Sequence, residues 1–202
     1  MSEISEGYVK YSVEHSTAPA IDIPNWKELN DARTRLYQLG LVGSHNGIGF
    51  GNLSIRYKGN EFFISGTATG ALPVLEPDGY CLIRSFDIEQ NRVVSAGPVQ
   101  PSSESMTHGA VYHSCSGVNC VIHIHSRVIF DGMVRDGFPA APENAAYGTP
   151  EIALAIGKCA RETDGDEGRI VLLGHDEGVI AYGPSVERAL MLILELHTQY
   201  QA

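Results

Sequence analysis

Residues 118–125 read Val-Asn-Cys-Val-Ile-His-Ile-His, an apolar run that ends in two histidines two positions apart. The run predicts a buried strand. Side chains at positions i and i+2 of a strand point to the same face of the sheet, so His123 and His125 would lie side by side. Neutral imidazole is a good zinc ligand, and a divalent cation would resolve the crowding of two such rings. Two partly exposed strand histidines are the alternative, and the spacing alone favours neither.

A catalytic metal site needs a third protein ligand, and His175 is the best candidate in the chain. It follows Gly174 at the end of the apolar stretch 170–173, where a buried strand enters a loop. Functional groups favour such positions. A solvated loop side chain is the ordinary alternative for a single histidine.

Hydrophobic periodicity and turn signals divide the rest of the chain into further elements. Helices are expected over residues 24–41, 103–115, 126–134, 149–161 and from 184 onward. Strands are expected over residues 52–57, 61–65, 80–84, 92–95, 118–125, 169–173 and 179–182. This pattern indicates a single domain, residues 21–202, in which helices cover the faces of a sheet. The polar residues 1–20 are expected to form a tail, or an arm that packs on a partner.

The net charge limits the classes of partner. Fourteen Lys and Arg stand against 24 Asp and Glu, which gives −10. That balance argues against a nucleic-acid binder, which needs a basic face, and against a polybasic membrane-surface protein. A single phosphate group needs only a local nest of amides and a few hydroxyls, so a small phosphorylated ligand is not excluded.

The chain shows no apolar run of membrane-spanning length and no signal-peptide pattern at its start. None of the four cysteines forms a Cys-x-x-Cys pair, so a zinc ribbon or a thioredoxin-type motif is not expected. These features predict a cytoplasmic protein without membrane contact, in which the cysteines are reduced.

Glu104 stands in the first turn of a predicted helix, directly after Ser102 and Ser103. A helix N-terminus offers free amides to an anion, and a carboxylate beside that anion would be a proton acceptor. His108, one turn later, could orient Glu104. The simpler interpretation is that the carboxylate only stabilises the helix N-terminus, by about 0.3–1 kcal/mol.

Two glycine-rich loops could offer backbone amides to a phosphate. The first is the stretch 43–51, which holds four glycines, and the second is Ser65-Gly-Thr-Ala-Thr-Gly70. Each signal is weak by itself, because most glycine loops are only turns.

In this order, the motifs resemble those of the class II aldolase/adducin family. They are GNLSIR (51–56), FFISGTATG (62–70), PSSESMTHGAVY (101–112), VIHIHS (121–126) and IVLLGHDEGVIAYG (170–183). The resemblance covers about residues 25 to 200. It implies an α/β fold with three αβα layers, in which a central, largely antiparallel or mixed sheet is flanked by helices.

Carried over by position, the resemblance assigns a role to each candidate residue. It places the zinc ligands at His123, His125 and His175, with Glu177 as an alternative third ligand, and the acid/base carboxylate at Glu104. The residues that would bind the substrate phosphate are Asn52, Thr69, Gly70, Ser102 and Ser103. In such enzymes the substrate chelates zinc, which stabilises an enediolate, while the carboxylate moves a proton.

The function that the resemblance implies is that of a zinc-dependent aldolase, a carbon–carbon lyase that acts on a small sugar phosphate. A sugar-phosphate 4-epimerase, a dehydratase, a decarboxylase or a non-catalytic adducin-like assembly module are the alternatives. The resemblance also implies a homotetramer, and the 19% of charged residues fits a buried contact surface. For a second proton donor, Tyr147 lies near the family position without aligning with it, and Tyr200 is the C-terminal candidate.

Overall fold

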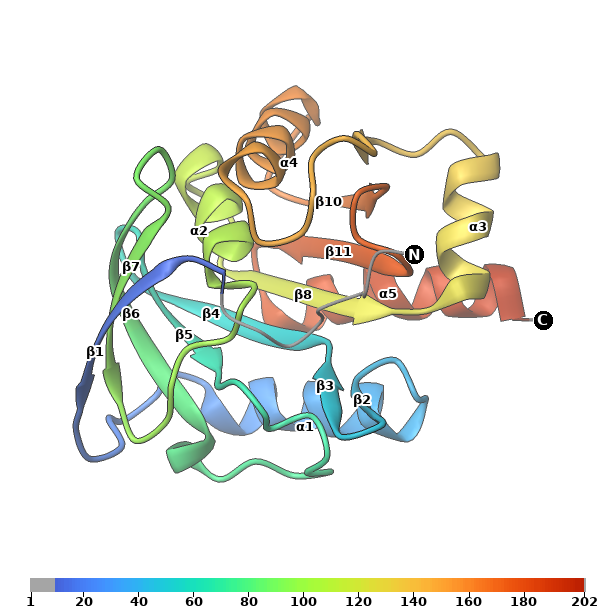
Figure 1. The fold of residues 1–202 in the computed structure, drawn as a ribbon. Helices are drawn as coiled ribbons and strands as arrows, with labels where there is room; N and C mark the ends of the chain where they lie inside the picture. Colours follow the sequence, from blue (N-terminus) through green and yellow to red (C-terminus); the bar gives the residue numbers. More distant parts are fainter. Residues whose placement is uncertain (1–9, 202) are drawn as a thin grey trace.

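The computed structural model describes residues 10–201, which form one mixed sheet, a small hairpin and the helices around them (Figure 1). The strands of the large sheet are β1 (Ser12–Thr17), β4 (Asn52–Lys58), β5 (Glu61–Ser65), β6 (Tyr80–Asp87), β7 (Arg92–Gly97), β8 (Cys120–His125), β9 (Ala140–Ala141), β10 (Gly168–Leu172) and β11 (Gly178–Gly183). The hairpin pairs β2 (Gly43–His45) with β3 (Ile48–Phe50). The helices are α1 (Trp26–Gln38), α2 (Ser105–Ser114), α3 (Arg127–Arg135), α4 (Pro150–Glu162) and α5 (Val186–Gln201), with a short 3-10 turn η1 at Pro77–Gly79.

The nine-stranded sheet has the order β1-β7-β6-β5-β4-β8-β11-β10-β9. Its two edge pairs, β1 with β7 and β9 with β10, are parallel, and the other neighbours are antiparallel. In Figure 1, α2 and α4 lie on one face of the sheet, while α1 and α5 lie on the other. The predicted three-layer αβα arrangement is therefore confirmed.

Strand β8 lies between β4 and β11 and alternates between two environments. Cys120, Ile122 and Ile124 belong to the apolar core on the side of α1 and α5. Val121 belongs to the second core, on the side of α2 and α4, and His123 and His125 share its face of the strand. The sheet thus has a fully apolar face and a face on which polar groups interrupt the core.

Local sequence explains where several helices begin. Ser126 caps α3, since its Oγ accepts a hydrogen bond from the amide of Ile129 at 3.4 Å. Pro150 stands at the first position of α4, where its missing N–H costs nothing. Helix α1 starts at Trp26, two residues after the predicted Pro24, because Asn25 takes a left-handed conformation with φ 53°.

Two other segments differ from the sequence-based expectation. Residues 12–17, expected within a tail or arm, form β1, whose backbone pairs with β7 from Ser12 opposite Arg92 to Thr17 opposite Gly97. A polar edge strand carries little hydrophobic alternation, so its pairing has no clear sequence signature. Residues 1–9 of the predicted tail lie outside the described residues. The glycine-rich stretch 43–51, expected to be a loop, contains the β2–β3 hairpin.

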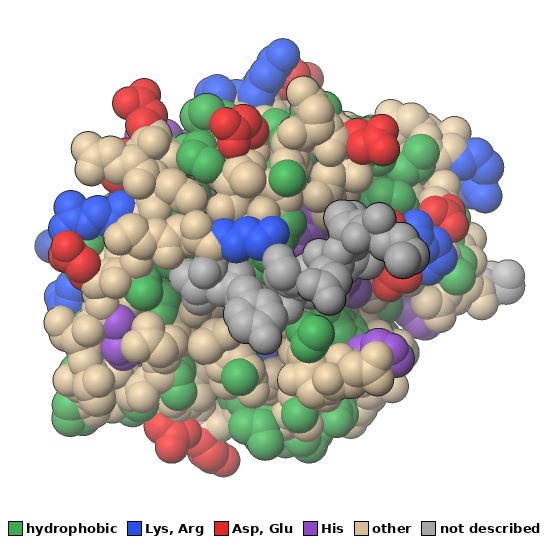
Figure 2. All heavy atoms as spheres, viewed as in Figure 1, with side chains coloured by type: hydrophobic (Ala, Val, Ile, Leu, Met, Phe, Trp, Pro, Cys, Tyr) green, Lys and Arg blue, Asp and Glu red, His purple; other side chains and the backbone are tan. Residues whose placement is uncertain are grey.

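The four cysteines are free, as expected, and three of them are buried. Among the described helices, none is long and apolar enough to cross a membrane. Figure 2 shows hydrophobic side chains exposed along the lower edge of the molecule, where Figure 1 places α1 and the loop that follows β5. Leu72 and Val74 in that loop are each about half exposed.

The central position of β8 predicts where the fold is most sensitive to truncation. Ile122 is fully buried between the two neighbouring strands and the α1–α5 layer. Ile122→Ala should lower the free energy of unfolding by about 2–5 kcal/mol, because it removes buried methyl groups and leaves a cavity. Leu154→Ala, at a position that is 53% exposed, should change it by less than about 0.5 kcal/mol. Denaturant unfolding of both variants measures the difference, and equal losses would contradict the placement of β8.

Candidate functional site

Three imidazole rings meet at the end of β8. The Nε2 atom of His125 lies 3.0 Å from Nε2 of His123 and 2.9 Å from Nε2 of His175. The ligand atoms of the three residues all lie within 4.8 Å of one another. All three side chains are at most 8% exposed. The sequence-based prediction that His175 joins the histidine pair is therefore met by the geometry.

The donor set fits a divalent cation. The carbonyl oxygen of Val179 can only accept, so Nδ1 of His123, 3.1 Å away, carries the proton and its Nε2 presents a lone pair. Burial, and then the two neighbouring imidazoles, lower the pKa of His123 well below its usual range, so this ring is neutral. A tetrahedral zinc ion with Zn–N distances of about 2.0–2.1 Å would separate its ligand atoms by about 3.3 Å. The separations from Nε2 of His125, 3.0 Å to His123 and 2.9 Å to His175, are close to that value.

The turn between β10 and β11 supplies the third imidazole. His175 follows Leu172, whose carbonyl accepts a hydrogen bond from the His175 amide at 3.0 Å. Glu177, the alternative third ligand, has a left-handed backbone with φ 63° and a side chain that is 42% exposed. Its Oε1 lies 3.4 Å from Nε of Arg127. The structure therefore places His175 in the cluster, and Glu177 points to Arg127.

Glu104 is the N-cap residue of α2 and is 3% exposed. Its Oε1 lies 3.6 Å from Nδ1 of His175, and its Oε2 has no hydrogen-bond partner within residues 10–201. A buried carboxylate oxygen without a donor costs free energy. This position is therefore more than a surface helix cap and leaves one oxygen available to a ligand.

The predicted contact between His108 and Glu104 is wrong. Nδ1 of His108 lies 2.7 Å from Oγ of Ser54, which in turn lies 2.8 Å from the hydroxyl of Tyr112. Burial lowers the pKa of His108 to about 3. His108 thus serves a buried network that joins α2 to β4.

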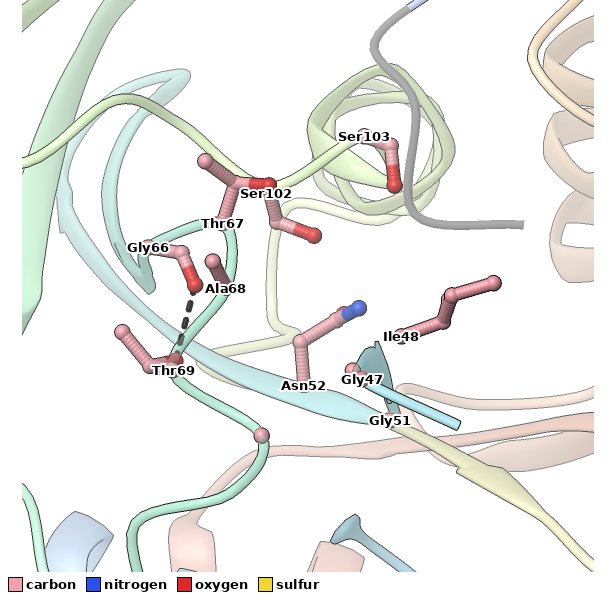
Figure 3. A pocket seen from close by; sticks show the side chains of 12 residues that line it. Gly47, Ile48, Gly51, Asn52, Gly66, Thr67, Ala68, Thr69, Ser102 and Ser103 are labelled. Atoms are coloured by element: carbon pink, nitrogen blue, oxygen red, sulfur yellow. Dashed lines mark hydrogen bonds between the residues drawn. The ribbon is translucent and has the colours of Figure 1, made fainter. Parts of the chain in front are cut away.

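Beside the histidines lies a cavity of about 160 Å³, which we call the amide pocket (Figure 3). It is lined by Gly47, Ile48, Gly49, Gly51, Asn52, Gly66, Thr67, Ala68, Thr69, Gly70, Ser102 and Ser103. The five residues predicted to bind a phosphate all belong to this set. In Figure 3, the side chain of Asn52 on β4 projects into the same space as those of Ser102 and Ser103 in the turn before α2. Among these twelve lining residues, all within the described range 10–201, none carries a charged side chain.

The backbone of the pocket loop is shaped to present amides. Ala68 has φ 60°, a left-handed conformation that non-glycine residues rarely adopt and that occurs in the backbone nests that bind anions. The Thr69 hydroxyl donates to the Gly66 carbonyl at 2.8 Å and so holds the turn. A Cβ on Gly70 would collide with the carbonyl oxygen of Gly43. Gly70 is thus needed for close packing of the loop on the β2–β3 hairpin.

The amide pocket and the histidine cluster adjoin. Asn52, which lines the pocket, stands directly opposite His123 in the paired strands β4 and β8. Ser102 and Ser103 line the pocket, and the next residue is Glu104, which approaches His175. A single small ligand can therefore reach both parts.

Sequence reasoning missed the role of Tyr11. This side chain is 6% exposed, and its hydroxyl donates to the carbonyl of Ser102 at 2.6 Å. It thereby fixes the turn that carries the serines and Glu104. Because the two residues stand 91 positions apart, no local pattern could reveal the contact.

The two candidate tyrosines are in different surroundings. The ring of Tyr147 packs edge-on against His175, with 4.5 Å between centroids, and Nζ of Lys10 lies 4.8 Å above the Tyr147 ring. The hydroxyl of Tyr200 donates to Asp136 at 2.8 Å, on the α3–α5 side of the molecule. Of these two candidates, Tyr147 is the one that lies against the histidine cluster.

The model of the class II aldolase and adducin N-terminal domain matches residues 27–202. The chain belongs to this family. Strand β1 precedes the matched range, so Tyr11 belongs to a part of the chain that the family model does not cover.

Similar proteins include a Mycoplasma pneumoniae protein named probable L-ribulose-5-phosphate 4-epimerase UlaF. It is 27% identical over 109 residues, which cover 50% of this chain and 41% of that protein. The chain thus matches less than half the length of this relative. L-fuculose-1-phosphate aldolase from Thermus thermophilus superposes with a TM-score of 0.64 at 23% identity, over 87% of this chain and 90% of that one. YgbL from Klebsiella pneumoniae gives 0.64 at 18% identity, over 87% and 86%. These structures share the class II aldolase-like fold.

Gly178 offers a test of the histidine geometry in which none of the three histidines is replaced. A Cβ at this position would lie 2.7 Å from Cδ2 of His175 and 3.3 Å from Cε1 of His123. Gly178→Ala should displace His175 and weaken the affinity for zinc by about 10–100-fold, the usual effect of disturbing ligand orientation. Competition with a chelating dye measures that affinity. Gly183→Ala, at the other end of β11 where the nearest atoms are 3.2 Å away or more, is the control, and equal zinc affinity in both variants would refute the assignment.

Proposed function

We propose that this protein is a zinc-dependent lyase of the aldolase type that acts on a small sugar phosphate. The observation that carries the proposal is the junction of two sites. Three histidines suited to a divalent cation adjoin a pocket whose described lining is uncharged and rich in amides and hydroxyls, and the buried carboxylate of Glu104 lies beside His175.

In this proposal His123, His125 and His175 hold the metal. The bound cation would supply Lewis-acid chemistry: it polarises a carbonyl and stabilises negative charge that develops on oxygen. The hydrogen bond from Nδ1 of His123 to Val179 keeps Nε2 as the ligand atom. Zinc is the metal expected for three imidazole ligands with an open fourth position.

The amide pocket would bind the phosphate group of the substrate. The amides of Ala68 and Gly70 donate to no acceptor within the described chain, and the hydroxyls of Ser102 and Ser103 add two donors. Asn52 also lines the pocket, and its side-chain Nδ2 group would donate to a phosphate oxygen. With the phosphate held there, the adjacent carbon atoms of the sugar would lie towards His123.

Glu104 would act as the acid/base. Its carboxylate is buried, its Oε1 lies near His175, and its Oε2 is available to take a proton from the carbon next to the substrate carbonyl. Removal from water strengthens its interaction with a nearby proton donor. The hydrogen bond from Tyr11 to Ser102 would keep the α2 N-terminus, and hence this carboxylate, in place.

A 4-epimerase is the alternative reaction, and the similarity to the Mycoplasma protein is the observation that favours it. A dehydratase or a decarboxylase would use the same metal and carboxylate. A non-catalytic assembly module has no use for a buried carboxylate oxygen that lacks a donor, or for three converging imidazoles. Product analysis separates the enzymes, since an aldolase releases an aldehyde and an epimerase only inverts one carbon.

Replacement of the proposed base tests the mechanism. Glu104→Gln should keep the fold, the zinc and the phosphate affinity, because the amide has the same shape. The rate of proton exchange should fall by about 10²–10⁴, the usual contribution of a positioned acid/base. The measurement is proton exchange in deuterated water at the carbon next to the carbonyl of dihydroxyacetone phosphate, with no aldehyde present. Glu177→Gln, which alters an exposed carboxylate paired with Arg127, should exchange at the wild-type rate.

If wild type and Glu104→Gln exchange equally fast, Glu104 is not the base. If neither exchanges with any ketose phosphate, the aldolase proposal fails and the other reactions take precedence. His123→Ala should abolish both zinc binding and exchange, and exchange that survives the loss of zinc would contradict the proposed metal chemistry.

We also propose a homotetramer in which α3 contributes to a contact between subunits. Val128 and Val134 on α3 are 50% and 45% exposed, close to the turn that carries His175, since Arg127 pairs with Asp176 at 2.5 Å. Light scattering at micromolar concentration should give four times the chain mass, and Val134→Glu should lower it. A monomer in wild type would contradict this assembly.

A further inference from the structure

One face of α1 carries a row of polar side chains that bind the backbone of the loop after β5. Arg33 donates from Nη2 to the carbonyl of Thr69 at 2.8 Å and from Nη1 to that of Leu72 at 2.6 Å. One turn earlier, Oδ1 of Asn30 accepts from the amide of Leu75 at 3.1 Å. The spacing of three residues places both side chains on the same face of the helix.

Arg33 is an unusual core residue, because it is only 1% exposed and is the largest of the fully buried side chains. Its hydrogen-bond partners are carbonyl oxygens, and within residues 10–201 no carboxylate lies within ion-pair distance of its guanidinium. Guanidinium stays protonated in proteins, although burial lowers the pKa of Arg33. A buried charge without a counter-charge is unfavourable, so the fold retains this cation at a cost in stability.

The cation lies directly behind the amide pocket. The carbonyl of Thr69 accepts from Arg33, and Thr69 and Gly70 both line the pocket. In a trans peptide the carbonyl and the following N–H point in opposite directions, so the N–H of Gly70 points away from the guanidinium. That amide donates to no acceptor in the described chain. The guanidinium therefore polarises the Thr69–Gly70 peptide and makes its N–H a better donor to an anion.

We infer that Arg33 is a positioning residue for the phosphate, a buried cation that orders the loop 66–72 and supplies a positive charge that the twelve described lining residues of the amide pocket do not carry. The inference rests on the proposed function, since it takes the pocket to be the phosphate site. The phosphate dianion would then be the counter-charge of Arg33, and the Thr69–Gly70 peptide would lie between the two charges.

Arg56 provides a matched control. Its guanidinium also donates to backbone carbonyls, from Nε to Val118 at 2.6 Å and from Nη2 to Cys115 at 2.8 Å, and burial lowers its pKa as well. It lies outside the lining of the amide pocket. A purely structural role for both arginines predicts equal effects on ligand binding when each is replaced.

The experiment is calorimetric titration of inorganic phosphate into zinc-loaded wild type, Arg33→Met and Arg56→Met. Arg33→Met should bind phosphate at least about tenfold more weakly than wild type, as loss of a charge-assisted interaction implies. Arg56→Met should bind within about twofold of wild type, and both variants should keep their zinc. Arg33→Lys keeps the charge but loses one of the two carbonyl contacts, so its affinity should lie between those of wild type and Arg33→Met.

Equal phosphate affinity in wild type and Arg33→Met overturns the inference and leaves the amide pocket intact as a phosphate site. Failure of wild type itself to bind phosphate overturns the pocket and the role of Arg33 together. Once a substrate is known, Arg33→Met should raise KM far more than it lowers kcat, whereas general destabilisation would not separate the two constants.

If the Arg33 variants do not fold, a measurement on the wild-type protein still tests the role of Arg33. Nitrogen NMR of the guanidinium groups should show the Arg33 signals moving on addition of phosphate, while those of Arg56 stay constant. Arg33 signals that do not respond to saturating phosphate would overturn the inference.

Discussion

The register of β8 is the constraint on which the rest of the structure depends. This strand is paired on both sides, so that His123 stands opposite Asn52 of β4 and Ile180 of β11. A shift of one residue would turn both histidines into the apolar core and bring Ile122 and Ile124 to the polar face. Burial of the isoleucines therefore fixes the position of the imidazoles, and the hydrophobic core holds the histidine cluster in place.

Burial of the polar groups on this face of the sheet costs free energy. Three imidazoles, a carboxylate oxygen without a donor and a guanidinium without a carboxylate all lie within or beside one region of the described chain. Each of these groups favours a bound partner of defined charge: a cation for the histidines, and an anion for the pocket in front of Arg33. Under the proposed function, one ligand that brings a phosphate and a metal-binding oxygen together would offset this cost.

Much of this site follows from local sequence. Period-two alternation places His123 and His125 on one face, and Ser-Ser-Glu at a helix start places Glu104 at an N-terminus. The features that could not be predicted from the sequence are long-range contacts and backbone conformations. Nothing marks Ala68 as left-handed, and Tyr11 and Arg33 act on residues 91 and 36 positions away. Strand β1 was missed for the same reason, since a polar edge strand is defined by its pairing partner.

The central claim is that one divalent metal is held by three histidines beside an anion pocket, and a crystal grown with zinc and phosphate tests it most directly. Anomalous diffraction at the zinc edge should give one strong peak within about 2.0–2.2 Å of the Nε2 atoms of His123, His125 and His175. Phosphate density should fill the cavity between Asn52, Gly70 and Ser102. A zinc peak that lacks any of the three imidazoles, or phosphate bound elsewhere while this cavity holds only water, would contradict the account.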